Sequence, residues 1–363
     1  MRIAFFHNLP PGGAKRVAYY QVKYLSQKHE VDLYTLKSQD PDFLNFSELK
    51  CNIYEYEFDQ GKRAGPFNRV LSDIKVLSKL RNLHKKIALD IDKKKYDIVV
   101  AHPDKYTQAP FVLSFLKTRK SYYCHELLRL AYEEHLMNFK PKTPAHLLYE
   151  KMTRSIRKKI DKDNALHSDI IVTNSAFTAL NVEKYYGRRA AVCYPGVDTD
   201  IFKKRNYKKI YDLLFVGDKV QEDGFDLLQS IVKLLPRKIK VNIISTRQNG
   251  KWISDSELSN EYNKAKIVLA LAVNEPLGLI PLESMACGVP VIAAAEGGYK
   301  ETVVNGKTGF LMSRSPKKIS LKIESILSNP NLQKKLRQNS VDYIKNVWSW
   351  EKRMKHMINV LET

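Results

Sequence analysis

The chain has 363 residues, of which 44% are hydrophobic and 28% charged, so it is globular and long enough for two domains. Its four cysteines form no Cys-x-x-Cys pair and no apolar run approaches ~18 residues, which excludes a disulfide framework, a zinc site and a membrane span. The net charge of +22 favours an anionic partner: a phosphate-bearing substrate, an anionic lipid surface or nucleic acid.

The first half of the chain alternates strands with helices. An apolar run at residues 2–6 leads into a Pro-Pro-Gly-Gly turn and an amphipathic helix around 14–28, the opening of a βαβ unit. Further apolar runs predict strands at residues 31–36, 97–101, 122–124 and 169–173. Uninterrupted apolar strands between helices are typical of a buried, doubly wound parallel sheet.

Two long helical patterns in the first half are strongly basic. Residues 69–95 carry nine basic and three acidic residues, and residues 140–162 carry eight basic and two acidic residues. The helices predicted at 67–95 and 144–162 place an apolar stripe beside Lys and Arg, as helices at a membrane surface do. Packing against the sheet is the alternative, and we favour it for the first of the two.

The strand–helix pattern restarts after residue 193, where Pro195-Gly196 interrupts it. Strands are predicted at residues 212–216, 240–245, 267–271 and 291–294, and a helical stretch at 316–345. We therefore predict two α/β domains, over 1–193 and 194–345, and a last helix over 346–363 that crosses back to the first domain. Ligands of open α/β sheets bind beyond the carboxyl ends of the strands, so a cleft is expected there.

The most informative stretch is residues 275–292. Glu275 lies in a Pro/Gly turn, an apolar helix that carries Glu283 ends at Gly288, and Pro290 precedes a Val-Ile-Ala strand. The helix N-terminus formed here presents backbone N–H groups and a positive dipole end to an anion. A carboxylate therefore stands on either side of a predicted anion site.

Other short elements surround this stretch in a fixed order. They are Val172-Thr-Asn-Ser-Ala-Phe-Thr178, Tyr194-Pro-Gly-Val-Asp198 with Phe202, Phe215-Val-Gly217, Glu275-x-x-Gly278 to Glu283-x-Met-Ala-x-Gly-x-Pro-Val, Gly297-Gly298 with Glu301, and Asn305-Gly-x-Thr-Gly309. Residues 171–312 thereby resemble the retaining glycosyltransferases of family 4, which have the GT-B fold of two Rossmann-like domains facing across a cleft. The first half matches more loosely, through its opening strand, its Gly-Gly turn and Cys124-His-Glu126.

The resemblance implies transfer of a hexose from a UDP- or GDP-sugar to a hydroxyl of a glycan or lipid-linked acceptor, with retention and without a metal ion. The N–H groups of Leu277, Gly278 and Leu279 would stabilise the leaving diphosphate. Glu283 would hold the ribose hydroxyls, since a carboxylate accepts from both hydroxyls of a diol. Glu275 would act in catalysis by accepting from a hydroxyl of the transferred sugar.

In the first domain the resemblance implies an acceptor side. Gly12 and Gly13 would let the acceptor or the phosphates pass close to the backbone. Lys15 and Arg16 form a basic pair at a helix start, where the dipole disfavours cations, so they indicate either an anion site or a solvated surface.

His125 follows a strand directly and by resemblance would lie near the transferred sugar as a second catalytic residue. A buried histidine with satisfied hydrogen bonds is the alternative. Glu126 and Arg129 are weaker candidates for acceptor contacts. Of the remaining motif residues, Asn174 and Ser175 are expected to shape the interdomain hinge, and Glu301 is expected to cap the helix that follows it.

The sequence departs from the family after Gly217. Most relatives carry an arginine and a lysine there that clamp the diphosphate, and this chain has Asp218 and Asp223. Lys219 or Arg247 would take over, or the donor sits differently, or activity is weak or lost. The chain also lacks one helix and strand of the donor-binding domain, between residues 246 and 254.

Two functions from different classes follow. The first is a cytoplasmic glycosyltransferase whose basic half meets a phosphorylated or membrane-embedded acceptor, peripherally on the inner face of the membrane. The second is an inactive GT-B-fold protein that binds a glycan or a partner enzyme. Nucleic acid is not expected as a partner, since no binding module or aromatic–basic pattern supports it.

Overall fold

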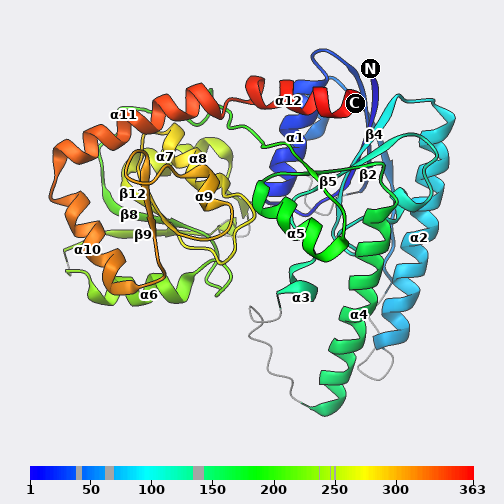
Figure 1. The fold of residues 1–363 in the computed structure, drawn as a ribbon, viewed down its shortest axis with the longest axis horizontal. Coiled ribbons are helices and arrows are strands. Elements are labelled where there is room, and N and C mark those ends of the chain that lie inside the picture. Colours follow the sequence, from blue (N-terminus) through cyan, green and yellow to red (C-terminus); the bar gives the residue numbers. More distant parts are fainter. Residues whose placement is uncertain (38–42, 62–68, 134–142, 237, 246, 249–250) are drawn as a thin grey trace. The chain divides into compact units, whose positions relative to one another are not determined.

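A computed structural model describes the chain except residues 38–42, 62–68, 134–142, 237, 246 and 249–250 (Figure 1). The chain divides into two compact units. The first comprises Met1–Asn174, Thr178–Cys193 and His356–Thr363, and the second comprises Ser175–Phe177 and Tyr194–Lys355. Each unit contains its own parallel sheet and core. No helix in the described ranges is long and apolar enough to cross a bilayer.

The first unit contains a seven-stranded sheet in the order β3-β2-β1-β4-β5-β6-β7, parallel throughout. Its strands are β1 (Arg2–Asn8), β2 (Glu30–Leu36), β3 (Asn52–Tyr56), β4 (Ile98–Asp104), β5 (Lys120–Cys124), β6 (Ile170–Thr173) and β7 (Ala191–Val192). The five strands predicted from apolar runs are confirmed. The two edge strands were missed because β3 is half-polar and β7 has only two residues.

The helices of the first unit are α1 (Gly13–Leu25), α2 (Arg69–Lys93), α3 (Arg129–Tyr132), α4 (Pro144–Leu166) and α5 (Ala176–Tyr186), with short 3-10 turns η1 (Phe46–Glu48) and η3 (Phe111–Ser114). The prediction that α2 packs on the sheet is confirmed for its later turns, where Leu80, Ile87 and Ile91 are buried. It is wrong for the first turns, where Ile74 is 47% exposed.

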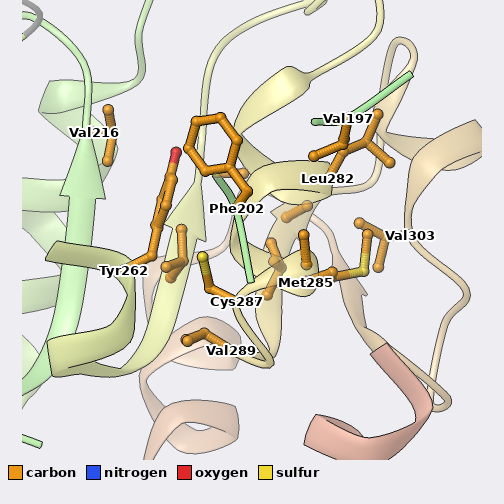
Figure 2. Packing of buried hydrophobic residues seen from close by; sticks show 14 of the residues in the cluster. Val197, Phe202, Val216, Tyr262, Leu282, Met285, Cys287, Val289 and Val303 are labelled. Carbon is orange, nitrogen blue, oxygen red and sulfur yellow. The ribbon is translucent and has the colours of Figure 1, made fainter. Parts of the chain in front are cut away.

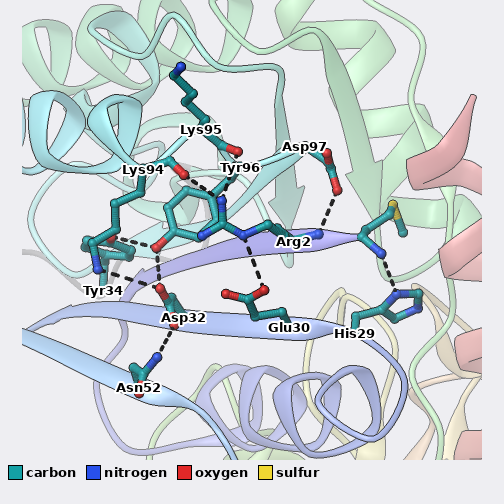
Figure 3. A network of polar contacts seen from close by, with 11 residues as sticks. Arg2, His29, Glu30, Asp32, Tyr34, Asn52, Lys94, Lys95, Tyr96 and Asp97 are labelled. Carbon is teal, nitrogen blue, oxygen red and sulfur yellow. Dashed lines mark hydrogen bonds and ion pairs between the residues drawn. The ribbon is translucent and has the colours of Figure 1, made fainter.

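A polar network ties the amino ends of the first three strands together (Figure 3). The Asp32 carboxylate accepts from the Asn52 amide at 2.7 Å and from the Tyr96 hydroxyl, which also bonds Tyr34 at 2.8 Å. Burial, and next the bond to Asp32, raises the pKa of Tyr96. These groups belong to the strand edge opposite the carboxyl ends, so they stabilise the sheet away from the predicted site.

The second unit contains a five-stranded parallel sheet in the order β14-β13-β12-β8-β9. Its strands are β8 (Tyr211–Val216), β9 (Val241–Ile244), β12 (Ala265–Ala270), β13 (Val291–Ala294) and β14 (Gly309–Met312), and a hairpin of β10 (Arg247–Gln248) and β11 (Lys251–Trp252) follows β9. Four strands are as predicted, and β14 was missed. The hairpin occupies the segment in which we expected the chain to lack one helix and one strand. The strand before it, β9, is an edge strand of the sheet.

The helices of the second unit pack on both faces of this sheet. They are α6 (Phe225–Leu234), α7 (Asp255–Lys264), α8 (Leu279–Ala286), α9 (Tyr299–Thr302), α10 (Pro316–Leu327) and α11 (Pro330–Val347), and α12 (Trp350–Glu362) begins here and ends in the first unit. Figure 2 shows the core around Tyr262, Leu282 and Met285. The helical stretch predicted at 316–345 is two helices, because Asn329 caps a new one by accepting from the Leu332 N–H at 2.9 Å.

Candidate functional site

In the second unit, the stretch from Glu275 to Gly288 forms the predicted loop and helix. Gly278 is the N-cap of α8 with φ 96°, a conformation that favours glycine. A β-carbon at this position would lie 2.5 Å from Cε1 of Tyr299, a fully buried ring. Glycine is therefore required here both by the backbone and by the packing of Tyr299.

The start of α8 presents backbone donors. No side chain caps it, and among the described residues no hydrogen-bond partner is found for the N–H groups of Leu277 and Gly278. The N–H of Leu279 lies in the first turn, where an α-helix offers no intrahelical acceptor. The three predicted donors thus lie together at the positive end of the helix dipole, an arrangement that suits a phosphate group.

The backbone of Glu275 is held by the loop after β13. The Gly298 N–H donates to the Glu275 carbonyl oxygen at 2.8 Å, and Glu296 Oε1 accepts from the Asn274 N–H at 3.2 Å. A β-carbon on Gly297 would lie 2.5 Å from the Glu275 carbonyl oxygen. The Gly-Gly motif therefore allows two backbones to touch and fixes the half-buried Glu275.

Arg314, two residues after β14, holds Glu296 in turn. One guanidinium nitrogen donates to Glu296 Oε1 at 3.1 Å and to the Leu271 carbonyl oxygen at 2.9 Å. Sequence reasoning missed this pair because its members follow different strands and belong to no motif. Arg314 thereby braces the Glu275 loop through Glu296 and through the end of β12.

We expect Arg314→Met to lower kcat about tenfold with a smaller change in nucleotide affinity. The substitution frees Glu296, and misplacing a reacting group slightly is costly to turnover. Steady-state kinetics and nucleotide titration check the split between the two parameters. Glu296→Gln should reproduce the loss in part, and Lys317→Met on α10 should be silent. Unchanged turnover with weakened nucleotide binding would contradict this role.

Glu283 lies in the second turn of α8 and is only 2% exposed. Its Oε2 accepts from the hydroxyl of Tyr262 on α7 at 2.9 Å. A buried carboxylate needs such partners, because burial without a hydrogen bond is costly for a charged group. The structure therefore places Glu283 on the helix whose start presents the donors, as predicted, and fixes its rotamer through Tyr262.

We expect Glu283→Gln to weaken UDP or GDP binding about 10- to 100-fold, since an amide has one acceptor oxygen and no charge for a diol. Calorimetric titration with the nucleotide measures the change. Tyr262→Phe is the matched control, because it removes the phenol hydroxyl and keeps the carboxylate. An equal loss in both variants would mean that the packing of α8, not the carboxylate, governs binding.

The two aspartates that replace the expected cations are engaged locally. Asp223 Oδ2 accepts from the Asp218 N–H at 2.6 Å, and Asp218 Oδ1 accepts from the Ser245 hydroxyl. Gly217 has φ 151°, and a β-carbon on it would lie 3.1 Å from Asp223 Oδ2. The carboxylates thus shape the loop after β8. Lys219 is exposed, and the side chain of Arg247 lies outside the described part of the chain.

A cavity of about 800 Å³ opens beside β9. Its lining includes Lys219, Ser245, Trp252, Ile253 and Glu257. Ser245 links this cavity to the aspartate loop through its bond to Asp218. The hairpin that replaces the lost helix and strand thus contributes an aromatic ring to a hollow next to the loop after β8.

In the first unit, His125 is 6% exposed and lies at the end of β5. Its Nε2 is 2.9 Å from Nδ1 of His102, whose Nε2 is 2.9 Å from the Gln21 amide oxygen. Burial lowers the pKa of His125 to about 3, and burial, followed by the neighbouring His125 and His7, lowers the pKa of His102 well below its usual value. Both rings are therefore neutral at physiological pH, so His125 can hydrogen-bond a sugar hydroxyl but is no general acid there.

Gly12 is the N-cap of α1 and Gly13 is its first residue, and Lys15 in the first turn is buried, with 4% exposure. The burial of His7, and next the positive charge of Lys15, lower the pKa of His7 to about 3. Both residues line a pocket of about 510 Å³ at the carboxyl ends of β1 and β2. Of the two alternatives for the basic pair, a solvated surface is wrong for Lys15, while Arg16 is half-buried.

The two weaker acceptor candidates have partners inside the first unit. Arg129 pairs with Glu133 at 3.3 Å. The carbonyl oxygen of Glu126 accepts from the Gln108 amide at 2.8 Å, and burial raises the pKa of its carboxyl. Their role as acceptor contacts stays a prediction.

The expectation that Glu301 caps the helix after it is wrong. Glu301 lies in α9, and its carboxylate accepts from the N–H groups of Ala176 and Phe177, both at 2.8 Å. It therefore caps the start of α5, whose first two residues belong to the second unit, as Glu301 does. The Ser175 hydroxyl donates to the Pro276 carbonyl oxygen at 2.6 Å, so this segment also braces the Glu275 loop.

Two family models match the chain. One, described as Glycosyltransferase Family 4, matches residues 11–201, and the other, Glycosyl transferases group 1, matches residues 248–342. An uncharacterized glycosyltransferase of Methanocaldococcus jannaschii is 29% identical over 204 residues, 51% of this chain and 57% of that protein. The matched part spans about half the length of the first curated relatives.

Two solved structures share the fold over the whole chain. Sucrose-phosphate synthase of Thermosynechococcus elongatus has a TM-score of 0.78 at 16% identity, covering 99% of this chain and 98% of that one. HepE of Anabaena in complex with UDP-glucose has a TM-score of 0.70 at 15% identity, covering 100% and 99%. At such identities the likeness concerns the fold alone.

Proposed function

Because the chain belongs to glycosyltransferase family 4, we propose that it transfers a hexose from a UDP- or GDP-sugar to a hydroxyl acceptor with retention of configuration. The predicted GT-B fold class is confirmed by the two parallel-sheet units and their structural relatives. The observation that carries the proposal is the start of α8, where Gly278 opens a set of backbone donors between Glu275 and Glu283.

The donor side of the proposal rests on the second unit. The N–H groups of Leu277, Gly278 and Leu279 would meet the diphosphate, and Glu283 would meet the ribose. The cavity beside β9 offers room for the base, with the Trp252 ring in its lining. UDP-glucose bound to the structural relative HepE supports a uridine nucleotide as the first donor to test.

The proposed reaction proceeds on one face of the sugar. The bond from the anomeric carbon to the diphosphate oxygen breaks, and the acceptor oxygen forms its bond on the same face. The acceptor proton passes to the departing phosphate oxygen, so no protein base is needed, and we propose no metal ion. Donors fixed at the helix start stabilise the growing charge without reorganisation.

On the acceptor side we propose a glycan or lipid-linked hydroxyl, bound in the first unit near Gly12 and Gly13. The buried Lys15 at this sheet edge supports an acceptor or donor group that carries negative charge. Glu126 and Arg129 remain proposed acceptor contacts. We place the protein in the cytoplasm, at the inner membrane face.

The test is a donor screen on the purified chain. UDP and GDP titrations identify the base, UDP- and GDP-sugars are then assayed for hydrolysis and transfer, and NMR of the product gives the anomer. Retention with one nucleotide supports the proposal, and inversion would overturn its mechanism. If neither nucleotide binds, a GT-B-fold protein without catalytic activity is the better description. The observation that favours this alternative is the presence of Asp218 and Asp223 where cations were expected.

A further inference from the structure

The first turns of α2 and α4 expose large aliphatic side chains. Helix α2 exposes Leu71 by 61% and Ile74 by 47%, and helix α4 exposes Leu147 by 39%, Leu148 by 60% and Met152 by 44%. The later turns of both helices bury apolar residues, among them Ile87 and Ala165. Leu89 on α2 and Leu166 on α4 are also exposed, by 50% and 39%, but each is a single side chain near the other end of its helix. The five exposed residues of the first turns form a cluster, which is called the apolar tip here.

The two helix ends lie side by side. The hydroxyl of Tyr149 on α4 donates to the carboxylate of Asp73 on α2, which joins their first turns. Figure 1 shows both ends away from the strands of the first unit. The apolar tip is therefore one surface built from two helices. Single exposed apolar side chains are common on soluble proteins, whereas a contiguous apolar patch indicates an interaction site.

Basic side chains surround the apolar tip. Residues 70–79 and 144–159 contain seven basic residues, Lys75, Lys79, Lys151, Arg154, Arg157, Lys158 and Lys159, and two acidic ones, Asp73 and Glu150. Asp73 bonds Tyr149, and Glu150 lies 3.7 Å from His146, so both acidic groups have partners within the tip. The net charge around the aliphatic patch is therefore strongly positive.

We propose that the apolar tip and its basic border dock on an anionic phospholipid bilayer. Aliphatic side chains enter the boundary between headgroups and acyl chains, while Lys and Arg stems reach the phosphates. A nucleic acid would use the positive charge and leave five aliphatic side chains exposed to water. This surface is separate from the donor chemistry and does not depend on the proposed reaction.

The test is vesicle co-sedimentation with the full chain. Wild type should bind vesicles of 70% phosphatidylcholine and 30% phosphatidylserine and be released by high salt, since charges exposed at such a surface are screened. It should bind pure phosphatidylcholine far less, because each basic side chain near an anionic surface adds about fivefold. Leu148→Ser with Met152→Ser should reduce binding about tenfold or more, as should Lys151→Gln with Lys158→Gln and Lys159→Gln.

Matched controls separate the tip from general surface properties. Leu180, which is 65% exposed on α5, is changed to Ser, and the exposed Lys317 and Lys318 on α10 are changed to Gln. All sites are at the surface, so unchanged melting temperatures establish intact folds. Equal losses in the control variants, or absence of wild-type binding to anionic vesicles at low salt, would overturn the proposal. So would tip variants that lose self-association or oligonucleotide binding instead.

Discussion

Glu275→Gln should lower kcat about 100-fold and leave the affinity for free UDP or GDP nearly unchanged. The hydrogen bond that the carboxylate accepts from a sugar hydroxyl strengthens as charge develops on the sugar in the transition state, and losing one such preorganised contact costs turnover on this scale. The nucleotide alone lacks the sugar, so it does not report the contact. Steady-state kinetics with a sugar donor measure the change in kcat, and calorimetry with the free nucleotide measures the change in affinity.

The isosteric change keeps the loop in place, because Glu275 is anchored through its backbone by Gly298. Glu324→Gln on α10 is a control for the removal of one negative charge from the second unit. Turnover at the wild-type rate in Glu275→Gln would remove this residue from the chemistry. Loss of nucleotide binding as well would indicate that the start of α8 had moved.

Gly278→Ala should abolish measurable nucleotide binding and destabilise the second unit by about 2–5 kcal/mol. The new β-carbon would lie 2.5 Å from the ring of Tyr299, and overpacking of a core costs about 1–3 kcal/mol. The φ of 96° adds about 1–2 kcal/mol for a residue other than glycine. Nucleotide titration and denaturant unfolding with a probe in this unit measure both effects.

Gly306→Ala separates the two causes. Gly306 has φ 75° in the same unit, and a β-carbon there would meet nothing within 4 Å. It should lose about 1–2 kcal/mol from backbone strain and keep full nucleotide binding. If Gly278→Ala behaves like Gly306→Ala, contact with Tyr299 does not position the start of α8.

The aspartates after β8 affect how much of the proposed diphosphate binding depends on the backbone N–H groups at the start of α8. In this structure Asp223 accepts from the Asp218 N–H, so the pair organises the loop where the family resemblance led us to expect cations. The N–H groups at Leu277 to Leu279 therefore carry more of the diphosphate binding in our proposal. Weak binding of the intact nucleotide together with normal dependence on Glu283 is the pattern expected from such a site.

Much of the fold could be read from the sequence because its signals are local. Apolar runs marked the central strands, and Gly278, Gly288 and Pro290 marked the start and end of α8 and the strand after it. The edge strand β3 escaped because one polar, half-exposed strand has no distinctive pattern. The first turns of α2 were mispredicted for a related reason: periodicity identifies an apolar face and does not say where the sheet beneath it ends.

By itself the sequence determined the two α/β units, the helix start flanked by Glu275 and Glu283, and the excess of positive charge. Only the tertiary structure decided that Arg314 braces Glu296, that Glu301 caps α5 and that Lys15 is buried. The physical reason is the range of the interactions. Helix starts and strands follow from neighbouring residues, whereas side chains that meet from different loops are brought together by the packing of the whole sheet.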